Sequence, residues 1–334
     1  MEKLRVGIIG LGVGEGHITG YRRHCDCEVV ALCDLSDEKL TMAEEKYPGV
    51  KLTRKADDIL DNPEINVVSI ASFDNYHYEQ VEKGIRNNKH LFVEKPLCLY
   101  EWQAEQIRAL LRDRPGLHLS SNLILRMCPR FRLLKEMIQE GTFGQLFYVE
   151  GDYNYGRLGK IAEGWRGKID FYSVVYGGAV HMVDLLLWLT GDTVEEVVAY
   201  GNHIASAGTA FRYNDFAVSL LRFRSGMLAK VSANFGCVMP HYHSLTLYGT
   251  RATFINGPQQ GMLFTSRDPN SSQQAITADY PGVHKGDLIY SFVQSILGEA
   301  PALVTKEDVF RTMSVCFAIE AAMEQQRAVS VRYI

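Results

Sequence analysis

The chain has 334 residues, of which 46% are hydrophobic and 22% charged, and its formal net charge is −4. These values are typical of a folded globular protein and exclude a largely disordered or fibrous chain, while a slightly acidic chain without basic stripes has no general attraction for nucleic acid. One hydrophobic core rarely organises a chain of this length, so we expect two domains.

The N-terminal run MEKLRVGIIGLGVG is apolar, but it is rich in glycine and no small-residue cleavage site follows it. A buried strand and turn therefore explain it better than a secretion signal. The other apolar stretches, such as VDLLLWLT, are too short to cross a bilayer. The seven cysteines form no C-x-x-C pair, which argues against structural zinc and disulfides. We expect a cytoplasmic protein with no metal, membrane or nucleic-acid partner.

Strand and helix patterns alternate along the first part of the chain. Strands are predicted over residues 5–10, 28–34, 65–72, 90–96 and 117–124, and helices after Gly16 and over residues 36–47, 76–88 and 100–113. Such alternation is typical of an α/β fold with a doubly wound parallel sheet. We expect this first domain to cover residues 1–123.

The pattern of predicted elements changes after a predicted helix over residues 129–141. Strand patterns then dominate over residues 145–155, 194–204, 214–223, 226–235, 243–249 and 252–256, and helices are predicted over residues 177–192, 285–298 and 306–325. The second domain, residues 124–334, is therefore expected to be α+β with a large, open, mostly antiparallel sheet.

A glycine turn directly follows the first predicted strand. Gly10 and Gly12 allow the close backbone approach with which a helix N-terminus holds a pyrophosphate, and Asp34, 22 residues after Gly12, can bind an adenosine ribose. Glu15 occupies the third glycine position of G-x-G-x-x-G, so either its side chain turns away or the helix begins one residue later. The carboxylate of Asp34, without an arginine directly after it, favours NAD over NADP.

Four further segments follow the glycine turn in the order ASFDNYH (71–77), GIRNNKHLFVEKPL (84–97), SNLILRMCPRFRLLKEMIQEGTFG (from 121) and GGAVHMVDLLLWLTG (from 177). Together they resemble the glucose-fructose oxidoreductase and inositol dehydrogenase family (Gfo/Idh/MocA). The resemblance implies an N-terminal Rossmann domain and a homodimer or homotetramer formed through the C-terminal sheet. It also implies hydride transfer between NAD(P) and a secondary alcohol or ketone of a cyclitol, a sugar or a sugar derivative, including phosphorylated or nucleotide-linked sugars.

Lys95 follows an apolar strand in HLFVEKPL and precedes Pro96. Ligands bind at the carboxyl ends of strands in open parallel sheets, and an ammonium there can stabilise a developing alkoxide. The resemblance implies that Lys95 lies beside the nicotinamide, often with a cis bond to the proline, and contacts the reacting hydroxyl.

His181 is the second catalytic candidate, as an acid/base. Asp184 shares its helical face, three residues on. The family usually carries an aspartate four residues before this histidine, where this chain has Gly177. Tyr172 or Tyr176 could supply the missing polar contact.

The remaining candidates are expected to line the cofactor or the substrate. The cofactor set is Gly10, Gly12, Val13, Gly14, Asp34, Leu35, Ser72, Phe73, Asp74, His77, Glu94 and Lys95, and the substrate set is Asn122, Arg126, Tyr155, Trp165, Arg166, Tyr176, His181 and Asp184. His77 fits a helix start without catalytic duty equally well. Polar domain-interface contacts would also explain Asn122 and Arg126, and solvated surface charge would explain the basic stretch around Trp165. For His241 and His243 we expect no role beyond contact with substrate.

Two other functions stay open. A glycosidase of this family oxidises its substrate only transiently with tightly bound NAD, and net NADH production would distinguish it. A transcriptional co-repressor keeps the dinucleotide site as a sensor without turnover, and the presence of Lys95 and His181 argues against it.

Overall fold

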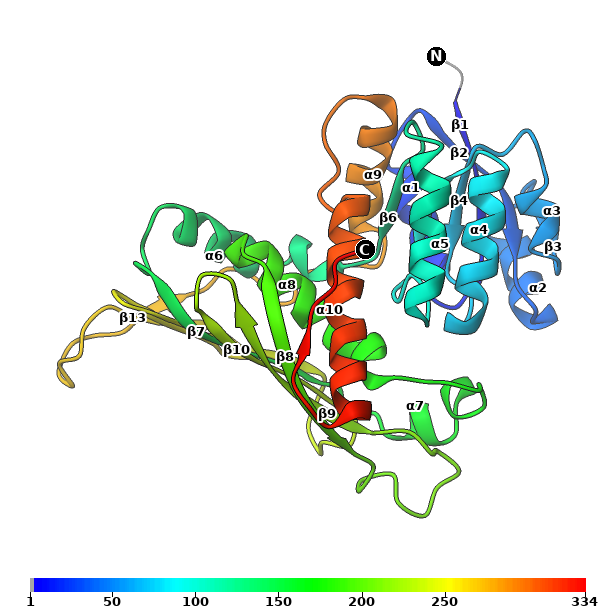
Figure 1. Ribbon diagram of the computed structural model, residues 1–334. Helices are drawn as coiled ribbons and strands as arrows, with labels where there is room; N and C mark the ends of the chain where they lie inside the picture. Colours follow the sequence, from blue (N-terminus) through cyan, green and yellow to red (C-terminus); the bar gives the residue numbers. More distant parts are fainter. Residues whose placement is uncertain (1–2) are drawn as a thin grey trace. The chain divides into compact units, whose positions relative to one another are not determined.

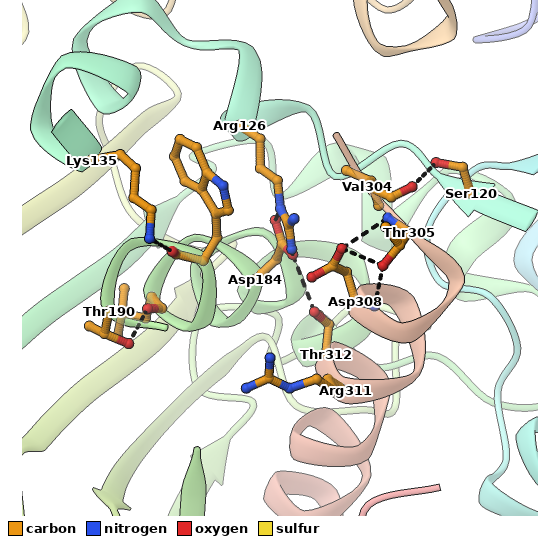
Figure 2. Close-up of polar contacts among 12 residues, drawn as sticks. Ser120, Arg126, Lys135, Asp184, Thr190, Val304, Thr305, Asp308, Arg311 and Thr312 are labelled. Carbon is orange, nitrogen blue, oxygen red and sulfur yellow. Dashed lines mark hydrogen bonds and ion pairs between the residues drawn. The ribbon is translucent and has the colours of Figure 1, made fainter. Parts of the chain in front are cut away.

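The computed structural model describes residues 3–334, whose contacts form two compact units. The first unit contains the chain up to Ile124 together with His284–Phe310 and Ile334, and the second contains Leu125–Val283 and Arg311–Tyr333. This division starts the second unit next to the boundary expected after residue 123. It also groups residues 284–310 with the first unit, where the side chain of Ser120 donates a hydrogen bond to the carbonyl oxygen of Val304 at 2.9 Å (Figure 2).

The first unit contains a six-stranded sheet whose strand pairs are all parallel. In spatial order the strands are β3 (Lys51–Thr53), β2 (Cys27–Cys33), β1 (Leu4–Ile9), β4 (Val67–Ile70), β5 (His90–Val93) and β6 (Leu119–Ser121). All four residues of β4 are buried, as expected for a parallel strand covered on both faces. The predicted doubly wound parallel sheet is confirmed.

Helices flank this sheet (Figure 1). They are α1 (Glu15–Arg22), α2 (Asp37–Lys46), α3 (Asp57–Leu60), α4 (His77–Arg86), α5 (Glu101–Arg112) and α9 (Asp287–Leu297). The Ser36 side chain caps α2 by accepting the N–H of Lys39 at 3.4 Å. α9 packs against α1 where two glycines meet, because a Cβ on Gly20 would lie 3.0 Å from the Cα of Gly286.

A nine-stranded, mostly antiparallel sheet forms the second unit, as expected, with one parallel pair between β7 and β10. In spatial order the strands are β14 (Gln274–Ile276), β13 (Gly261–Phe264), β12 (Thr253–Asn256), β11 (Tyr242–Gly249), β7 (Leu146–Asn154), β10 (Leu228–Asn234), β9 (Phe216–Phe223), β8 (Val194–Asn202) and β15 (Val329–Ser330). The sequence did not predict β13, β14 or β15.

The second unit also contains helices. They are α6 (Pro129–Gln139), α7 (Gly159–Ala162), α8 (Val180–Thr190) and the part of α10 (Lys306–Gln325) that belongs to the second unit. α8 packs on β7 at Gly151, where a Cβ would lie 3.1 Å from Met182 and 3.2 Å from Leu186. α8 is shorter than the predicted helix, because a π-helical turn, Val175–Ala179, precedes it.

The face of the nine-stranded sheet opposite α8 exposes large apolar side chains. Along β9, Ala217, Ser219, Leu221 and Phe223 are buried, whereas Leu220 is 57% exposed. Leu228 on β10 and Tyr200 on β8 are 51% and 64% exposed. Among residues 3–334, no helix combines the length and apolar character that crossing a bilayer requires.

Candidate active site

The glycine turn after β1 lies directly against the end of β4. Gly10 has φ +91°, and a Cβ there would collide with the carbonyl oxygen of Ala71 and lie 2.8 Å from the nitrogen of Ser72. A Cβ on Gly14 would collide with the carbonyl oxygen of Gly10. The turn thus presents main chain to a ligand at the N-terminus of α1, which fits a pyrophosphate.

Glu15 is the first residue of α1, and its side chain turns toward α2. Lys46 Nζ lies 2.7 Å from Glu15 Oε1, and the hydroxyl of Tyr47 lies 3.4 Å from the same oxygen. Of the two alternatives from the sequence, the structure therefore shows the side chain turning away. The ion pair with Lys46 also offsets negative charge near the helix N-terminus.

Asp34 follows β2 and is held by two main-chain donors and one lysine. Leu11 N lies 2.7 Å from Oδ2, Ser36 N lies 2.9 Å from Oδ1, and Lys39 Nζ lies 3.1 Å from Oδ2. Burial alone would raise the pKa of Asp34, but these donors hold it below its usual value. The carboxylate is therefore charged and can accept ribose hydroxyls. Sequence reasoning missed Lys39, although it is the third residue of α2.

His77 ties the loop after β4 to the segment after β5. Its ring is buried, with Nδ1 2.6 Å from the carbonyl oxygen of Pro96 and Nε2 3.2 Å from that of Ser72. The Ser72 hydroxyl donates to Gln80 Oε1 at 2.8 Å. His77 therefore has a structural position beside the residue that follows Lys95. The Lys95–Pro96 peptide is cis.

The other expected cofactor residues lie on exposed loops of the same unit. Val13 is 38% exposed, Leu35 61% and Phe73 40%. Asp74 begins a short 3-10 turn that leads into α4. Their contact with a cofactor stays a prediction.

Glu94 is buried at the end of β5 and belongs to a hydrogen-bond network inside the first unit. Its Oε1 lies 2.6 Å from Asn122 Nδ2 and 3.1 Å from His17 Nε2. His17 Nδ1 lies 2.8 Å from Ser69 Oγ, and Asn122 Nδ2 also donates to the carbonyl oxygen of Lys285 at 3.1 Å. Burial alone would raise the pKa of Glu94, but the His17 hydrogen bond and the nearby Lys285 charge hold it well below its usual range.

Lys95 is half-buried between two fixed neighbours. Glu94 is anchored through His17 and Asn122, and Pro96 through His77. The main chain on both sides of the ammonium is therefore held in place. The sequence predicted the position of Lys95, but it gave no local signal for His17, whose pairing with Glu94 spans 77 residues.

In the second unit, His181 on α8 stacks on Tyr153 of β7 with ring centroids 5.8 Å apart. Tyr153 also meets His241 at 5.0 Å and His243 at 5.3 Å, edge to face. His243 Nδ1 lies 2.9 Å from the hydroxyl of Tyr280. The structure thus gathers these three histidines around one tyrosine. The sequence alone did not predict this cluster, because it depends on the register of β11 on β7, in which His243 pairs with Tyr153.

A basic and aromatic group surrounds Tyr155 and Trp165. Tyr155 contacts Phe235 with ring centroids 4.8 Å apart, and the guanidinium of Arg157 lies 5.0 Å from the Tyr155 ring centre. Arg166 lies 4.6 Å from the ring centre of Trp165. Rings of this kind can stack on a sugar. Contact with substrate stays a prediction for Tyr155, Trp165 and Arg166.

Arg126 and Asp184, both expected in the substrate set, are bonded to each other inside the second unit (Figure 2). Their side chains are 4% and 1% exposed. Asn122, also in that set, lies in the first unit and bonds to Glu94. Tyr176 packs against Phe317 of α10 with ring centroids 5.8 Å apart.

Among residues 3–334, one group of potential metal ligands lies close together, in the segment after α1, with its histidine buried. Ligand atoms of His24, Cys25 and Asp26 lie within 4.8 Å of one another. The main-chain N–H of Asp26 already donates to His24 Nδ1 at 3.3 Å. We assign this group no function.

The parallel sheet, the glycine turn and the ionised Asp34 fit a dinucleotide-binding domain, and comparison with known proteins identifies it as that of an NAD-binding oxidoreductase. Residues 4–119 match the oxidoreductase family with an NAD-binding Rossmann fold, and residues 131–255 match the GFO/IDH/MocA C-terminal domain. The chain belongs to the Gfo/Idh/MocA oxidoreductase family, as its motifs indicated.

Relatives extend over the full length of the chain. Myo-inositol 2-dehydrogenase of Thermotoga maritima is 23% identical and matches over 99% of both chains, and 1,5-anhydro-D-fructose reductase of Ensifer adhaerens is 27% identical over 68% of each. Among solved structures, levoglucosan dehydrogenase in complex with NADH has a TM-score of 0.87 at 20% identity over 100% of both chains. Scyllo-inositol dehydrogenase of Lactobacillus casei, with bound NAD(H) and scyllo-inositol, has a TM-score of 0.80 at 19% identity over 99% of both.

Proposed function

We propose that the protein transfers a hydride between NAD(H) and a secondary alcohol or ketone of a cyclitol or sugar, with Lys95 and His181 as its catalytic residues. The observation that carries this proposal is the placement of Lys95 at the end of β5, with both neighbours anchored. The names of its relatives support the substrate class, since inositols, levoglucosan and anhydrofructose are all polyhydroxylated rings.

Each of the proposed site residues has a separate role. Gly10 and Gly14 let the turn pack tightly against its own main chain and the end of β4, so that main-chain N–H groups at the start of α1 can hold a pyrophosphate, and Asp34 accepts hydrogen bonds from a ribose. Bound NAD supplies the hydride acceptor. Lys95 donates a hydrogen bond to the substrate oxygen and stabilises its negative charge, while His181 takes the hydroxyl proton. Loss of that proton and of the C–H hydride leaves a ketone, and the reverse steps reduce it.

Substrate screening with a matched lysine variant tests this proposal. We expect net NADH formation with at least one member of a panel of inositols, levoglucosan, free sugars and sugar phosphates. Lys95→Met should lower kcat by about 10²-fold or more while NADH affinity is retained, because its charge acts on the substrate oxygen. Lys55→Met, at an exposed lysine of the same unit, is the control.

Three results would contradict the proposal. An active Lys95→Met enzyme would remove Lys95 from the mechanism. Hydrolysis of a glycoside without net NADH would identify the transient oxidation of a glycosidase. NADH binding without turnover of any panel member would favour a sensor.

We also propose that the protein is a homodimer or homotetramer formed through the open face of the nine-stranded sheet, where Leu220 and Leu228 are exposed. Both side chains lie on the same face of the sheet, and apolar side chains exposed on a sheet face are candidates for an association site. Light scattering on a sizing column should show an oligomer that Leu220→Glu with Leu228→Glu dissociates. Met42→Glu, at a 46% exposed residue of α2, should not. A monomeric native protein would contradict this proposal.

The proposed location is the cytoplasm. All seven cysteines of the sequence lie among residues 3–334 and are free thiols. Free thiols are usual in a reducing compartment.

A further inference from the structure

The phenol of Tyr172 fills the space beside Gly177. A Cβ added to Gly177 would collide with the Tyr172 hydroxyl oxygen, and it would lie 2.9 Å from Tyr172 Cζ and 3.4 Å from Phe235 Cζ. Tyr172 is 2% exposed, so this hydroxyl is inside the second unit. A side chain at position 177 and the present position of Tyr172 therefore exclude each other.

Gly177 and His181 are four residues apart in a continuous helical segment. The π-helical turn Val175–Ala179 leads directly into α8, which begins at Val180. Residues four apart lie on the same face of a helix, one above the other. The Tyr172 hydroxyl, in contact with position 177, therefore lies on the His181 face, one turn before the imidazole.

Aromatic neighbours fix the Tyr172 ring in this position. Its centroid lies 6.0 Å from that of Phe211, 6.3 Å from that of Phe235 and 6.4 Å from that of Trp165, all edge to face. The next residue, Ser173, accepts the main-chain N–H groups of Val175 and Tyr176 at 3.0 Å and 3.2 Å. These contacts hold the Tyr172 ring in one orientation at the start of the helical segment.

Tyr176, the other tyrosine considered from the sequence, packs elsewhere. Its ring contacts Phe317 on α10 at 5.8 Å and Phe171 at 6.0 Å. Adjacent helical residues point about 100° apart, so Tyr176 does not share the face of Gly177 and His181. The geometry separates the two candidates in favour of Tyr172.

We propose that Tyr172 is a positioning residue for His181: its hydroxyl provides a neutral hydrogen-bonding group on the face of the helix where a side chain at position 177 would stand. This inference rests on the proposed role of His181. A phenol can orient an imidazole by accepting or donating a hydrogen bond without adding a full negative charge. An aspartate on that face would orient the ring and also favour its protonated form.

Several other polar groups surround this part of the unit. Tyr153 stacks on His181, Arg166 lies 6.0 Å from the Tyr172 ring centre, and Glu320 of α10 bonds to Ser173. Asp184, on the same helical face, is paired with Arg126. These groups are unchanged in variants of Tyr172 or Gly177. A change in the pH profile of such a variant therefore reports the effect of the substituted side chain.

Three variants test the proposal, each measured by kcat/KM against pH, NADH affinity and melting temperature. Tyr172→Phe should lower kcat/KM about tenfold, less than the ~10²- to 10⁴-fold typical of losing an acid/base group, with NADH affinity unchanged. Tyr333→Phe, the control in the same unit, should change kcat/KM by less than about twofold, since its hydroxyl bonds to the main chain of Val194. Tyr172→Ala with Gly177→Asp should regain activity over Tyr172→Ala alone and move the acidic limb of the profile to higher pH.

The outcomes separate this inference from the proposed function. A Tyr172→Phe enzyme with the native kcat/KM and pH profile would overturn the role of Tyr172 while leaving the oxidoreductase proposal intact. A fully active His181→Asn enzyme would instead overturn the role of His181. If Tyr172→Phe has a lowered melting temperature, the double variant decides: rescue supports the proposal, and a folded, unrescued double variant overturns it.

Discussion

Arg126 holds the carboxylate of Asp184 at two points, with Nη2 2.6 Å from Oδ1 and Nε 3.0 Å from Oδ2. Figure 2 shows Thr312 of α10 on the other side, with its hydroxyl 3.3 Å from Asp184 Oδ1. Asp184 lies one turn after His181 on α8, so this buried pair also limits how the helix that carries the imidazole can rotate.

Removal of one partner of this pair should destabilise the protein strongly. Asp184→Asn leaves the Arg126 charge buried without its anion, which typically costs about 3–5 kcal/mol of unfolding free energy. Urea unfolding of the second unit measures the loss. The double variant Arg126→Met with Asp184→Leu should lose less than the sum of the two single changes, because neither charge remains. Additive losses would show that the two residues do not act as a pair.

Glu94 should stabilise the first unit in a pH-dependent manner. Its pKa is held well below the usual value of 4.5, so its contribution is present above pH 4.5 and is lost as the pH falls through the folded-state pKa. Glu94→Gln should therefore lower the unfolding free energy by about 1–3 kcal/mol at pH 7. The difference from the native protein should shrink below pH 4.5. A difference that does not vary with pH would contradict the network around His17.

Glu320 should make stability depend on pH in the opposite direction. Burial raises its pKa from 4.5 to about 7, while the hydrogen bond from Ser173 lowers it only in part. A raised folded-state pKa contributes stability below pH 4.5 that is lost as the pH rises through about 7. Over that range the native protein should lose about 2–4 kcal/mol relative to Glu320→Gln. Measuring the unfolding free energy at pH 5 and pH 8 checks this, and Glu140→Gln, at an exposed glutamate, is the control. The same pH dependence of unfolding free energy in the native protein and in Glu320→Gln would contradict the prediction.

Lys39 should reduce the discrimination against NADP that Asp34 provides. Its ammonium lies 3.1 Å from the carboxylate and 3.6 Å from a Cβ built on Gly12, so it offsets repulsion of a 2′-phosphate. Lys39→Gln should weaken NADPH binding about two- to fivefold relative to NADH, the range of a partly exposed pair. Fluorescence titration of both cofactors measures the ratio. Tighter NADPH than NADH binding by the native protein would overturn the preference for NAD.

Patterns within single segments predicted much of the fold. The strands of the first unit are nearly continuous apolar runs because both faces are covered, and that signal needs no knowledge of their neighbours. α10 spans residues 306–325 as predicted, because twenty residues of helix carry their own periodicity. The short strands β13 to β15 were missed, because two to four residues carry no period and form only by pairing with an adjacent edge.

The site divides in the same way. Gly10, Asp34 and Lys95 could be proposed from the sequence, because each lies at the end of a predicted strand and the resemblance to the family pointed to Lys95. Tertiary structure alone decided that His17 pairs with Glu94, that Lys39 meets Asp34, and that Tyr172 fills the space at Gly177. These contacts depend on side-chain directions and on segments brought together by packing, and one-dimensional spacing contains neither.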